Sequence, residues 1–199
     1  MNNNTLQTIK ELNQRMKINQ PFGIPSEYTI IARPSDEIVD KIGKFIDSLE
    51  EIDPTPYFYN KSELHLTFFG TLPVNLEKEK FCKFAMSQIK TIPSFEVKGI
   101  SNSTIMLTPI NFSLGDFREA VNNYLGINNY SNYSKAMLET PWINILRFRQ
   151  EPKDQLIKFF ERNRMLDFGL LKIDTLYMCK TDRRVIRFPY RDAIKIHLG

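Results

Sequence analysis

The stretch Glu63–Gly70 reads ELHLTFFG, and the fold is best deduced from it. Apolar residues alternate with Glu63, His65 and Thr67, as they do in a half-buried β-strand. Successive side chains of a strand point to opposite faces, so His65 and Thr67 should share one face, about 7 Å apart at ~3.3 Å per residue. An imidazole transfers protons near neutral pH, and a hydroxyl donates to phosphate oxygens. The pattern indicates phosphate chemistry, although an isolated His-x-Thr also fits a strand that merely turns polar residues outward.

Strands and helices alternate on both sides of this stretch, with hairpins between them. Before it we expect a strand at Tyr28–Ala32, a helix at Ser35–Ile52 and a strand at Tyr57–Tyr59. After it the pattern predicts a helix at Glu77–Lys90, strands at Phe95–Ile100 and Thr104–Ile110, a helix at Ser113–Leu125, a strand at Trp142–Phe148, a helix at Pro152–Arg164, and a terminal hairpin of Leu166–Lys180 and Val185–Leu198. This order predicts an α+β fold with mixed or antiparallel sheet.

The stretch from His65 to Gly70, read in this context, resembles the first signature of the 2H phosphoesterase superfamily, which includes the LigT-like RNA 2′,3′-cyclic phosphodiesterases and 2′-5′ RNA ligase-like proteins. The resemblance extends over roughly residues 28–198. It implies two pseudo-symmetric lobes of sheet with outer helices around a central cleft. It also implies a second His-x-Thr strand, and the strand Trp142–Phe148 stands in that place.

The second motif departs from the pattern of the superfamily. Trp142 stands where the second His is expected, Asn144 stands where the second Thr is expected, and Arg147 keeps its place. The resemblance therefore carries over catalytic roles only to His65 and Thr67. It implies substrate-binding roles for Asn144, Arg147 and Trp142, and Trp142 could instead pack in the core.

The resemblance implies a mechanism in which two histidines flank the scissile P–O bond, one deprotonating water and the other protonating the leaving oxygen. One hypothesis is therefore a metal-independent phosphodiesterase with reduced or altered catalysis, acting on 2′,3′-cyclic phosphates or 2′-5′ linkages at nucleotide or RNA ends. The alternative is an inactive member of the same fold that binds phosphate, nucleotide or RNA. His197, the other histidine of the chain, is interpreted as an exposed residue at the end of a strand.

The composition limits the remaining choices. The net charge is +4, too small for a dedicated duplex-binding surface, and two isolated cysteines fit a reducing compartment. We expect no cofactor, no metal site and no membrane span, a cytoplasmic location and a monomer. We predict an N-terminal arm or short helix in residues 1–25 and one bilobal domain in residues 26–199. A polar loop at Asn128–Ser134 and arginines in the last hairpin, Arg183, Arg184, Arg187 and Arg191, are weaker candidates for contacts with the substrate.

Overall fold

One antiparallel sheet organises the molecule. The structure is a computed structural model, and it describes residues 27–101, 103–128, 130, 141–148, 150–181 and 193–198. Its larger sheet has eight strands in the order β10-β9-β1-β3-β6-β5-β4-β8. The strands are β1 (Glu27–Ala32), β3 (Leu66–Pro73), β4 (Ser94–Ser101), β5 (Thr104–Pro109), β6 (Trp142–Asn144), β8 (Asp167–Lys172), β9 (Thr175–Thr181) and β10 (Ile194–His197). A separate ribbon pairs β2 (Tyr57–Phe58) with β7 (Leu146–Arg147).

The sheet divides into two equivalent halves at its centre, where β3 pairs with β6. On one side of this junction β1, β9 and β10 follow β3; on the other side β5, β4 and β8 follow β6. Each half contains four strands, and in each the strand at the junction lies beside the strand that precedes it across a helix: β1 beside β3, and β5 beside β6. This correspondence is the pseudo-symmetry predicted for two lobes. The α+β class is confirmed.

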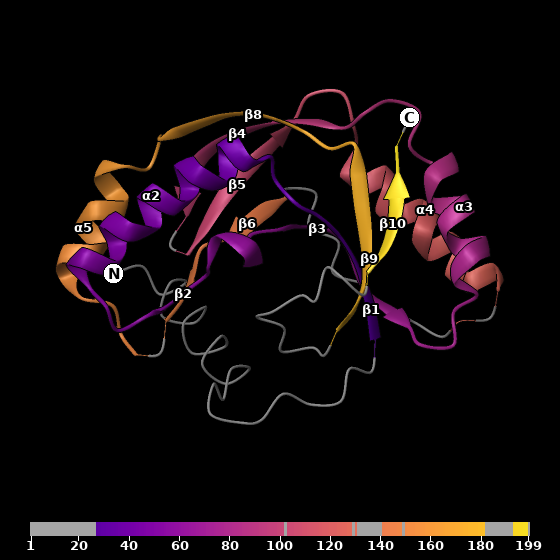
Figure 1. Ribbon diagram of the computed structural model, residues 1–199, viewed down its shortest axis with the longest axis horizontal. Coiled ribbons are helices and arrows are strands. Elements are labelled where there is room, and N and C mark those ends of the chain that lie inside the picture. The colour runs from indigo at the N-terminus through magenta and orange to yellow at the C-terminus, as the bar shows by residue number, and fades with distance from the viewer. Residues whose placement is uncertain are drawn as a thin grey trace.

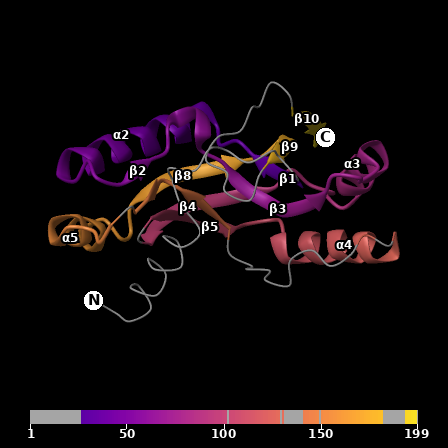
Figure 2. The same ribbon diagram turned by 90° about the horizontal axis from the view of Figure 1, so that it is seen from below.

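Each half is covered by its own pair of helices (Figures 1 and 2). The helices are α2 (Asp36–Ile52), α3 (Lys78–Ser87), α4 (Leu114–Ile127) and α5 (Asp154–Arg162), with a single 3-10 turn, η1 (Lys61–Glu63), before β3. Helix α2 contacts β8 and α5, whereas α3 contacts β10 and α4 contacts β3. The helical pairs thus lie at opposite ends of the sheet, outside the central strands.

The helices form where the sequence predicts them, within a few residues at each end. The apolar residues of α2 recur every three or four positions, and its buried stripe includes Ile38, Ile42 and Leu49. Helix α4 begins after Ser113, whose hydroxyl accepts a hydrogen bond from the Asp116 amide at 3.1 Å. Such a cap satisfies one of the amide groups left without a partner at a helix start.

Two predicted strands differ from the structure. The expected arm Leu166–Lys180 is two strands, because the chain leaves β8 at one edge of the sheet and crosses at Ile173 and Asp174 to enter β9 beside β1. The expected strand Trp142–Phe148 breaks after Asn144, and Arg147 pairs with β2 instead. Period-two patterning alone cannot detect a strand that changes partner, since both segments are extended.

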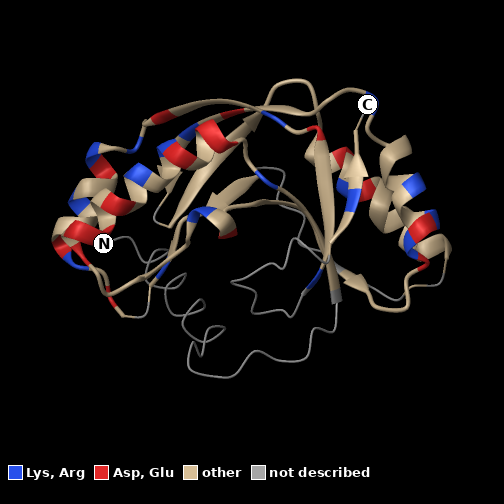
Figure 3. Cartoon of the chain, in the orientation of Figure 1, with Lys and Arg blue, Asp and Glu red and all other residues tan. Residues whose placement is uncertain are grey.

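Several predictions fall on residues outside the described part of the chain. These are the N-terminal arm, most of the Asn128–Ser134 loop, and the turn of the last hairpin with its arginines. Among the described residues, no helix combines the length and the apolar character needed to cross a membrane. In Figure 3 acidic and basic residues intermingle along the outer helices, and pairs such as Glu37–Lys41 and Glu79–Lys83 lie 2.8 Å apart.

Candidate active site

The centre of the site is the pairing of Leu66 in β3 with Ile143 in β6. The strands are antiparallel. Extending this pairing by one residue in each direction therefore places His65 opposite Asn144 and Thr67 opposite Trp142. Directly opposed residues have Cβ atoms about 4.5–5.5 Å apart. Residues from two distant segments of sequence are therefore brought together at the junction of the two halves.

These side chains lie on the face of the sheet away from the helices. Leu66, Ile143 and their neighbours Ala32 and Ile105 are fully buried in the apolar core under the helices. Because side chains alternate between faces, the residues on either side of Leu66 and Ile143 point the opposite way. Thr67, Trp142 and Asn144 are each half-buried there.

Taking the Leu66–Ile143 pair, which joins the two halves, as the centre of the pseudo-symmetry relates the residues of one half to those of the other. Around the Leu66–Ile143 pair, Trp142 precedes Ile143 as His65 precedes Leu66, and Asn144 follows as Thr67 does. The pseudo-symmetry of the strand order supports this equivalence. This assignment agrees with the one that the resemblance implies for the second motif.

His65 is the buried residue of the group. It lies just before the first residue of β3, rather than inside the longer strand that the sequence predicts, and its exposed fraction is 7%. Its Nδ1 lies 2.7 Å from the carbonyl oxygen of Glu63. A carbonyl can only accept a hydrogen bond, so Nδ1 carries the proton and Nε2 of the neutral ring holds a lone pair.

The surroundings of His65 favour the neutral ring. Burial is the main cause that lowers its pKa, to about 4, and the positive charge of Arg147 acts in the same direction. The hydrogen bond to the Glu63 carbonyl and the charge of that carboxylate oppose the shift. A neutral imidazole with a lone pair on Nε2 can accept a proton but has none to give from that atom.

Arg147 is held in the β2–β7 ribbon. Its backbone pairs with Tyr57, and its Nε donates to the Tyr59 hydroxyl at 3.0 Å. The guanidinium carbon lies 5.9 Å from the centre of the Tyr59 ring. Its pairing partner Tyr57 donates to the carboxylate of Glu63, whose carbonyl accepts a hydrogen bond from His65, so the ribbon lies beside the imidazole. The structure thus brings Arg147 to the same region as His65, although it leaves the strand in which the sequence placed it.

Arg118 is a residue that the sequence reasoning missed. It lies on α4, is 9% exposed, and donates from Nε to the Phe68 carbonyl and from Nη2 to the Thr67 carbonyl, both at 2.9 Å. These bonds hold the backbone of β3 immediately after His65. A single arginine inside an amphipathic helix gives no sequence signal of such a contact.

Glu63 was also missed as a partner of His65. Its side chain is 6% exposed and closes a capping box with Asn60, which stands three residues earlier. The Asn-x-x-Glu spacing immediately before His65 is the signal that could have revealed it, because this spacing is typical of a helical turn with a reciprocal cap.

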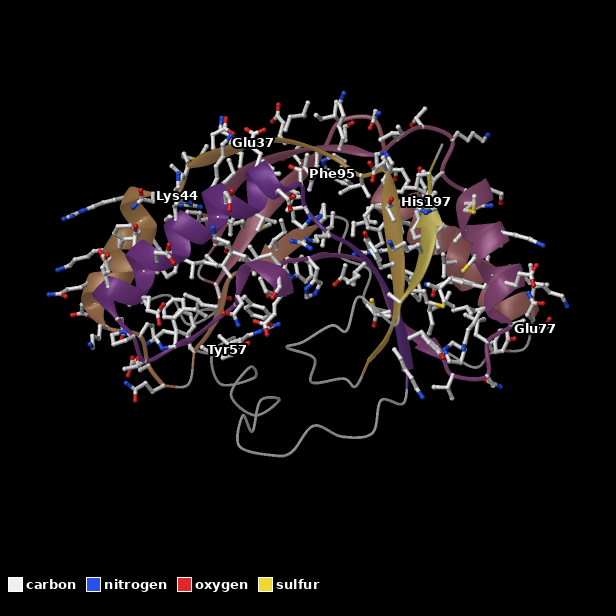
Figure 4. All side chains as sticks on the ribbon, viewed as in Figure 1. Glu37, Lys44, Tyr57, Glu77, Phe95 and His197 are labelled. Atoms are coloured by element: carbon white, nitrogen blue, oxygen red, sulfur yellow. The ribbon has the colours of Figure 1, made fainter. Side chains whose placement is uncertain are left out.

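His197 does not reach this region. It is exposed on β10, and its Nδ1 lies 3.3 Å from the Thr175 hydroxyl oxygen. Three strand spacings of ~4.8 Å separate β10 from β3 across the sheet. Figure 4 shows it in the half opposite to Tyr57. The interpretation of His197 as an exposed strand-end residue is confirmed.

Two pockets in the described part of the chain lie elsewhere. One of about 400 Å³ is lined by residues of α2, β2 and η1, including Tyr57 and Tyr59. Another of about 360 Å³ lies between α5 and the β4–β5 hairpin. Neither is lined by His65. The central cleft between the halves stays a prediction.

No protein-family profile matches the sequence, and no curated protein matches it either. Solved structures do match the fold. A phosphoesterase crystal structure superposes with a TM-score of 0.61 at 14% identity, over 88% of this chain and 99% of that chain. LigT of Escherichia coli in its apo form gives 0.55 at 16% identity, over 89% and 99%. TT0787 of Thermus thermophilus gives 0.52 at 12% identity, over 87% and 95%.

These likenesses bear on the architecture. The matches span nearly the whole of each compared protein, so both halves of the sheet and their helices are shared. E. coli LigT has also been solved in complex with ATP, 3′-AMP, NADP⁺ and phosphate. At these identities the likeness establishes the fold and leaves the activity open. The fold expected from the resemblance at the His65 motif is thus confirmed: the chain has the fold of LigT, of TT0787 and of the phosphoesterase compared with it.

Proposed function

We propose that the chain binds a phosphate ester at the junction of β3 and β6 and cleaves it slowly, with His65 as the only acid–base histidine. The substrate class is a 2′,3′-cyclic phosphate or a 2′-5′ linkage at a nucleotide or RNA end. The nucleotide and phosphate complexes of E. coli LigT, which shares the fold, support this choice of ligand. All the residues invoked belong to one chain, so a monomer suffices.

The chemistry follows from the state of His65. Its Nε2 lone pair takes a proton from water, and the water oxygen attacks phosphorus. The Thr67 hydroxyl and the Asn144 amide donate hydrogen bonds to phosphate oxygens, and Arg147 supplies positive charge. The P–O bond to the leaving oxygen then breaks, and that oxygen takes its proton from solvent. Neither a metal ion nor a cofactor enters the reaction.

The observation that carries the proposal is the register of the Leu66–Ile143 pair. With this pair as the centre of the pseudo-symmetry, Trp142 is the counterpart of His65. The indole N–H can donate a hydrogen bond but does not act as an acid or base near neutral pH. An acid–base partner contributes about 10²–10⁴ in rate, so its absence lowers turnover by about that factor. Asn144 still provides a donor in place of the second threonine.

A binding protein without turnover is the second candidate, and Trp142 is the observation that favours it. The residue is half-buried on the same face as Thr67, where a planar indole provides a stacking surface for a base. In this case the His65–Thr67 pair holds the phosphate, and the ester remains intact.

One assay separates these candidates. Nucleoside 2′,3′-cyclic phosphates and short 2′-5′-linked oligonucleotides are incubated with the wild-type chain, with His65→Gln and with His197→Gln as the matched control, in the presence of a chelator. Loss of turnover in His65→Gln alone supports the phosphodiesterase. Absence of turnover in every sample, together with binding that His65→Gln weakens, supports the binding protein. If neither turnover nor binding is found, both proposals fail for these ligands.

A further inference from the structure

The carboxylate of Glu63 is buried beside His65 and accepts several hydrogen bonds on one oxygen. The Tyr57 hydroxyl donates to Oε2 at 2.8 Å, the Asn60 amide at 2.9 Å and the Asn60 side chain at 3.1 Å. A buried carboxylate is costly unless it is hydrogen-bonded, and here the donors come from two separate elements. Figure 4 shows Tyr57 at β2, in the lobe that contains α2 and η1.

These bonds fix the position of the Glu63 carbonyl. The side chain closes the 3-10 turn Lys61–Glu63 by bonding back to Asn60, and the backbone of the same residue accepts from Nδ1 of His65 at 2.7 Å. The side chain and the carbonyl belong to one residue at the end of a single turn. A carboxylate anchored at three points therefore restricts where the carbonyl can lie.

We propose that Glu63 is a positioning residue that holds His65 with its proton on Nδ1 and its Nε2 lone pair directed at the ligand. This inference rests on the proposed function, since it deepens the role given to His65. Glu63 acts through His65 and does not touch the substrate. Its chemical contribution is the choice of tautomer: without a fixed acceptor at Nδ1, the ring can carry its proton on either nitrogen.

Tyr57 extends this role to the second half of the molecule. It belongs to β2, whose partner strand β7 contains Arg147 opposite Tyr57. The rings of Tyr57 and Tyr59 pack edge to face with their centres 5.5 Å apart, and the Tyr59 hydroxyl accepts a hydrogen bond from Arg147. The ribbon that orients Arg147 thus also donates to Glu63. The β2–β7 ribbon therefore helps to position both His65, the proposed base, and Arg147, the cation.

The tautomer can be read directly because the chain has only two histidines. In an untagged His197→Gln background, His65 contributes the only imidazole signals to a ¹⁵N spectrum. We expect a protonated Nδ1 and an unprotonated Nε2 near neutral pH, in the absence of any substrate. The reverse tautomer in the wild-type site would overturn the proposal.

Glu63→Gln is the decisive variant, because it keeps the size of the side chain and removes its charge. We expect the two His65 tautomers to become mixed, and the pKa of His65 to fall further as the favourable carboxylate charge is lost. Turnover should drop about 10–100-fold in kcat with little change in KM, as expected for a displaced catalytic group. Tyr57→Phe removes one of the donors and should produce a smaller change of the same kind.

The matched control is Glu51→Gln, which removes an exposed carboxylate from α2. It should leave the His65 spectrum unchanged. If a folded Glu63→Gln keeps the wild-type tautomer and kcat, the positioning role is refuted even where turnover depends on His65. If the tautomer responds as expected but no phosphodiester is cleaved, the positioning role stands and the proposed catalysis fails.

Discussion

The β3 half and the β6 half of the site share one architecture but differ in rigidity and in chemistry. Strand β3 has eight residues and is paired along β1, and Arg118 binds two of its carbonyls. Strand β6 has three residues and then diverges to pair with β2 through β7. The half that keeps a histidine is thus the more extensively supported one.

This difference separates two requirements of a phosphate site. Holding a phosphate needs donors, and in the proposed function these are Thr67 in one half and Asn144 in the other. Moving a proton needs a group that titrates, and at the two equivalent positions only His65 does so. Under this proposal the second half has no proton carrier but keeps a donor for phosphate. Four predictions test this contrast.

Trp142→His restores the missing proton carrier and should have the largest effect. If the two halves are equivalent as the register indicates, kcat/KM for a 2′,3′-cyclic phosphate should rise about 10²–10⁴-fold, since an acid is now available to the leaving oxygen. The measurement is steady-state turnover of the variant against the wild-type chain.

Its control is Trp142→Phe, which also removes the indole but supplies no titratable group. A gain in both variants would mean that Trp142 only obstructs the ligand. A folded Trp142→His without any gain would break the equivalence of the two halves. Adding Asn144→Thr to Trp142→His should improve turnover further, because it restores a hydroxyl donor.

Arg118→Leu tests the support of β3. The carbonyls of Thr67 and Phe68 would lose the charged donor that they now share. Each buried acceptor left without a donor costs about 1–3 kcal/mol. We expect the free energy of unfolding to fall by about 4 kcal/mol, measured in urea. Exposed Arg162→Leu on α5 is the control and should change it by less than about 0.5 kcal/mol. Equal effects would show that β3 needs no such support.

Much of this architecture follows from the sequence because hydrophobic patterning is local. The stripe of α2 and the alternation around His65 predict their elements within a few residues. The contacts of Arg118 cannot be read in the same way, since they join residues about fifty positions apart. The break between β6 and β7 has the same cause: which strand an extended segment pairs with depends on tertiary packing.

The candidate site shows the same distinction between what local sequence predicts and what depends on tertiary contacts. The equivalence of Trp142 with His65 comes from the family resemblance, and the Leu66–Ile143 register is consistent with it. The Asn60-x-x-Glu63 spacing could predict the capped turn before His65. It could not predict that the Glu63 carbonyl accepts from His65, because a backbone acceptor has no side-chain identity. The sequence places Arg147 in one strand with Trp142, whereas it lies in β7, and its bond to Tyr59 depends on the β2–β7 ribbon that the sequence did not reveal.

The buried His65 should also make stability depend on pH. The pKa of His65 is about 4 in the folded chain, against 6.5 for the free side chain, which represents the unfolded chain. Between pH 4 and pH 6.5 the unfolded chain therefore binds a proton that the folded chain does not. The free energy of unfolding should therefore fall by about 3 kcal/mol as pH drops from 6.5 to 4. Urea unfolding of the wild-type chain and of His65→Gln across this range isolates the effect. Parallel curves would show that His65 is solvated in the folded chain, contrary to its burial.

The smallest expected effect concerns Arg147, the only charged member of the β6 half of the site. Arg147→Lys keeps the charge but loses the planar group that bonds Tyr59 at 3.0 Å, so the cation is no longer held in one direction. We expect binding of a nucleoside 3′-monophosphate to weaken about tenfold, or about 1.4 kcal/mol, measured by calorimetry at constant salt. Tyr59→Phe removes only the acceptor and should reproduce part of the loss. If Tyr59→Phe leaves the affinity unchanged while Arg147→Lys lowers it, the ribbon does not orient the cation, and the β6 half contributes through charge alone. If neither variant changes the affinity, the phosphate is held by the β3 half, and the two halves differ in binding as well as in proton transfer.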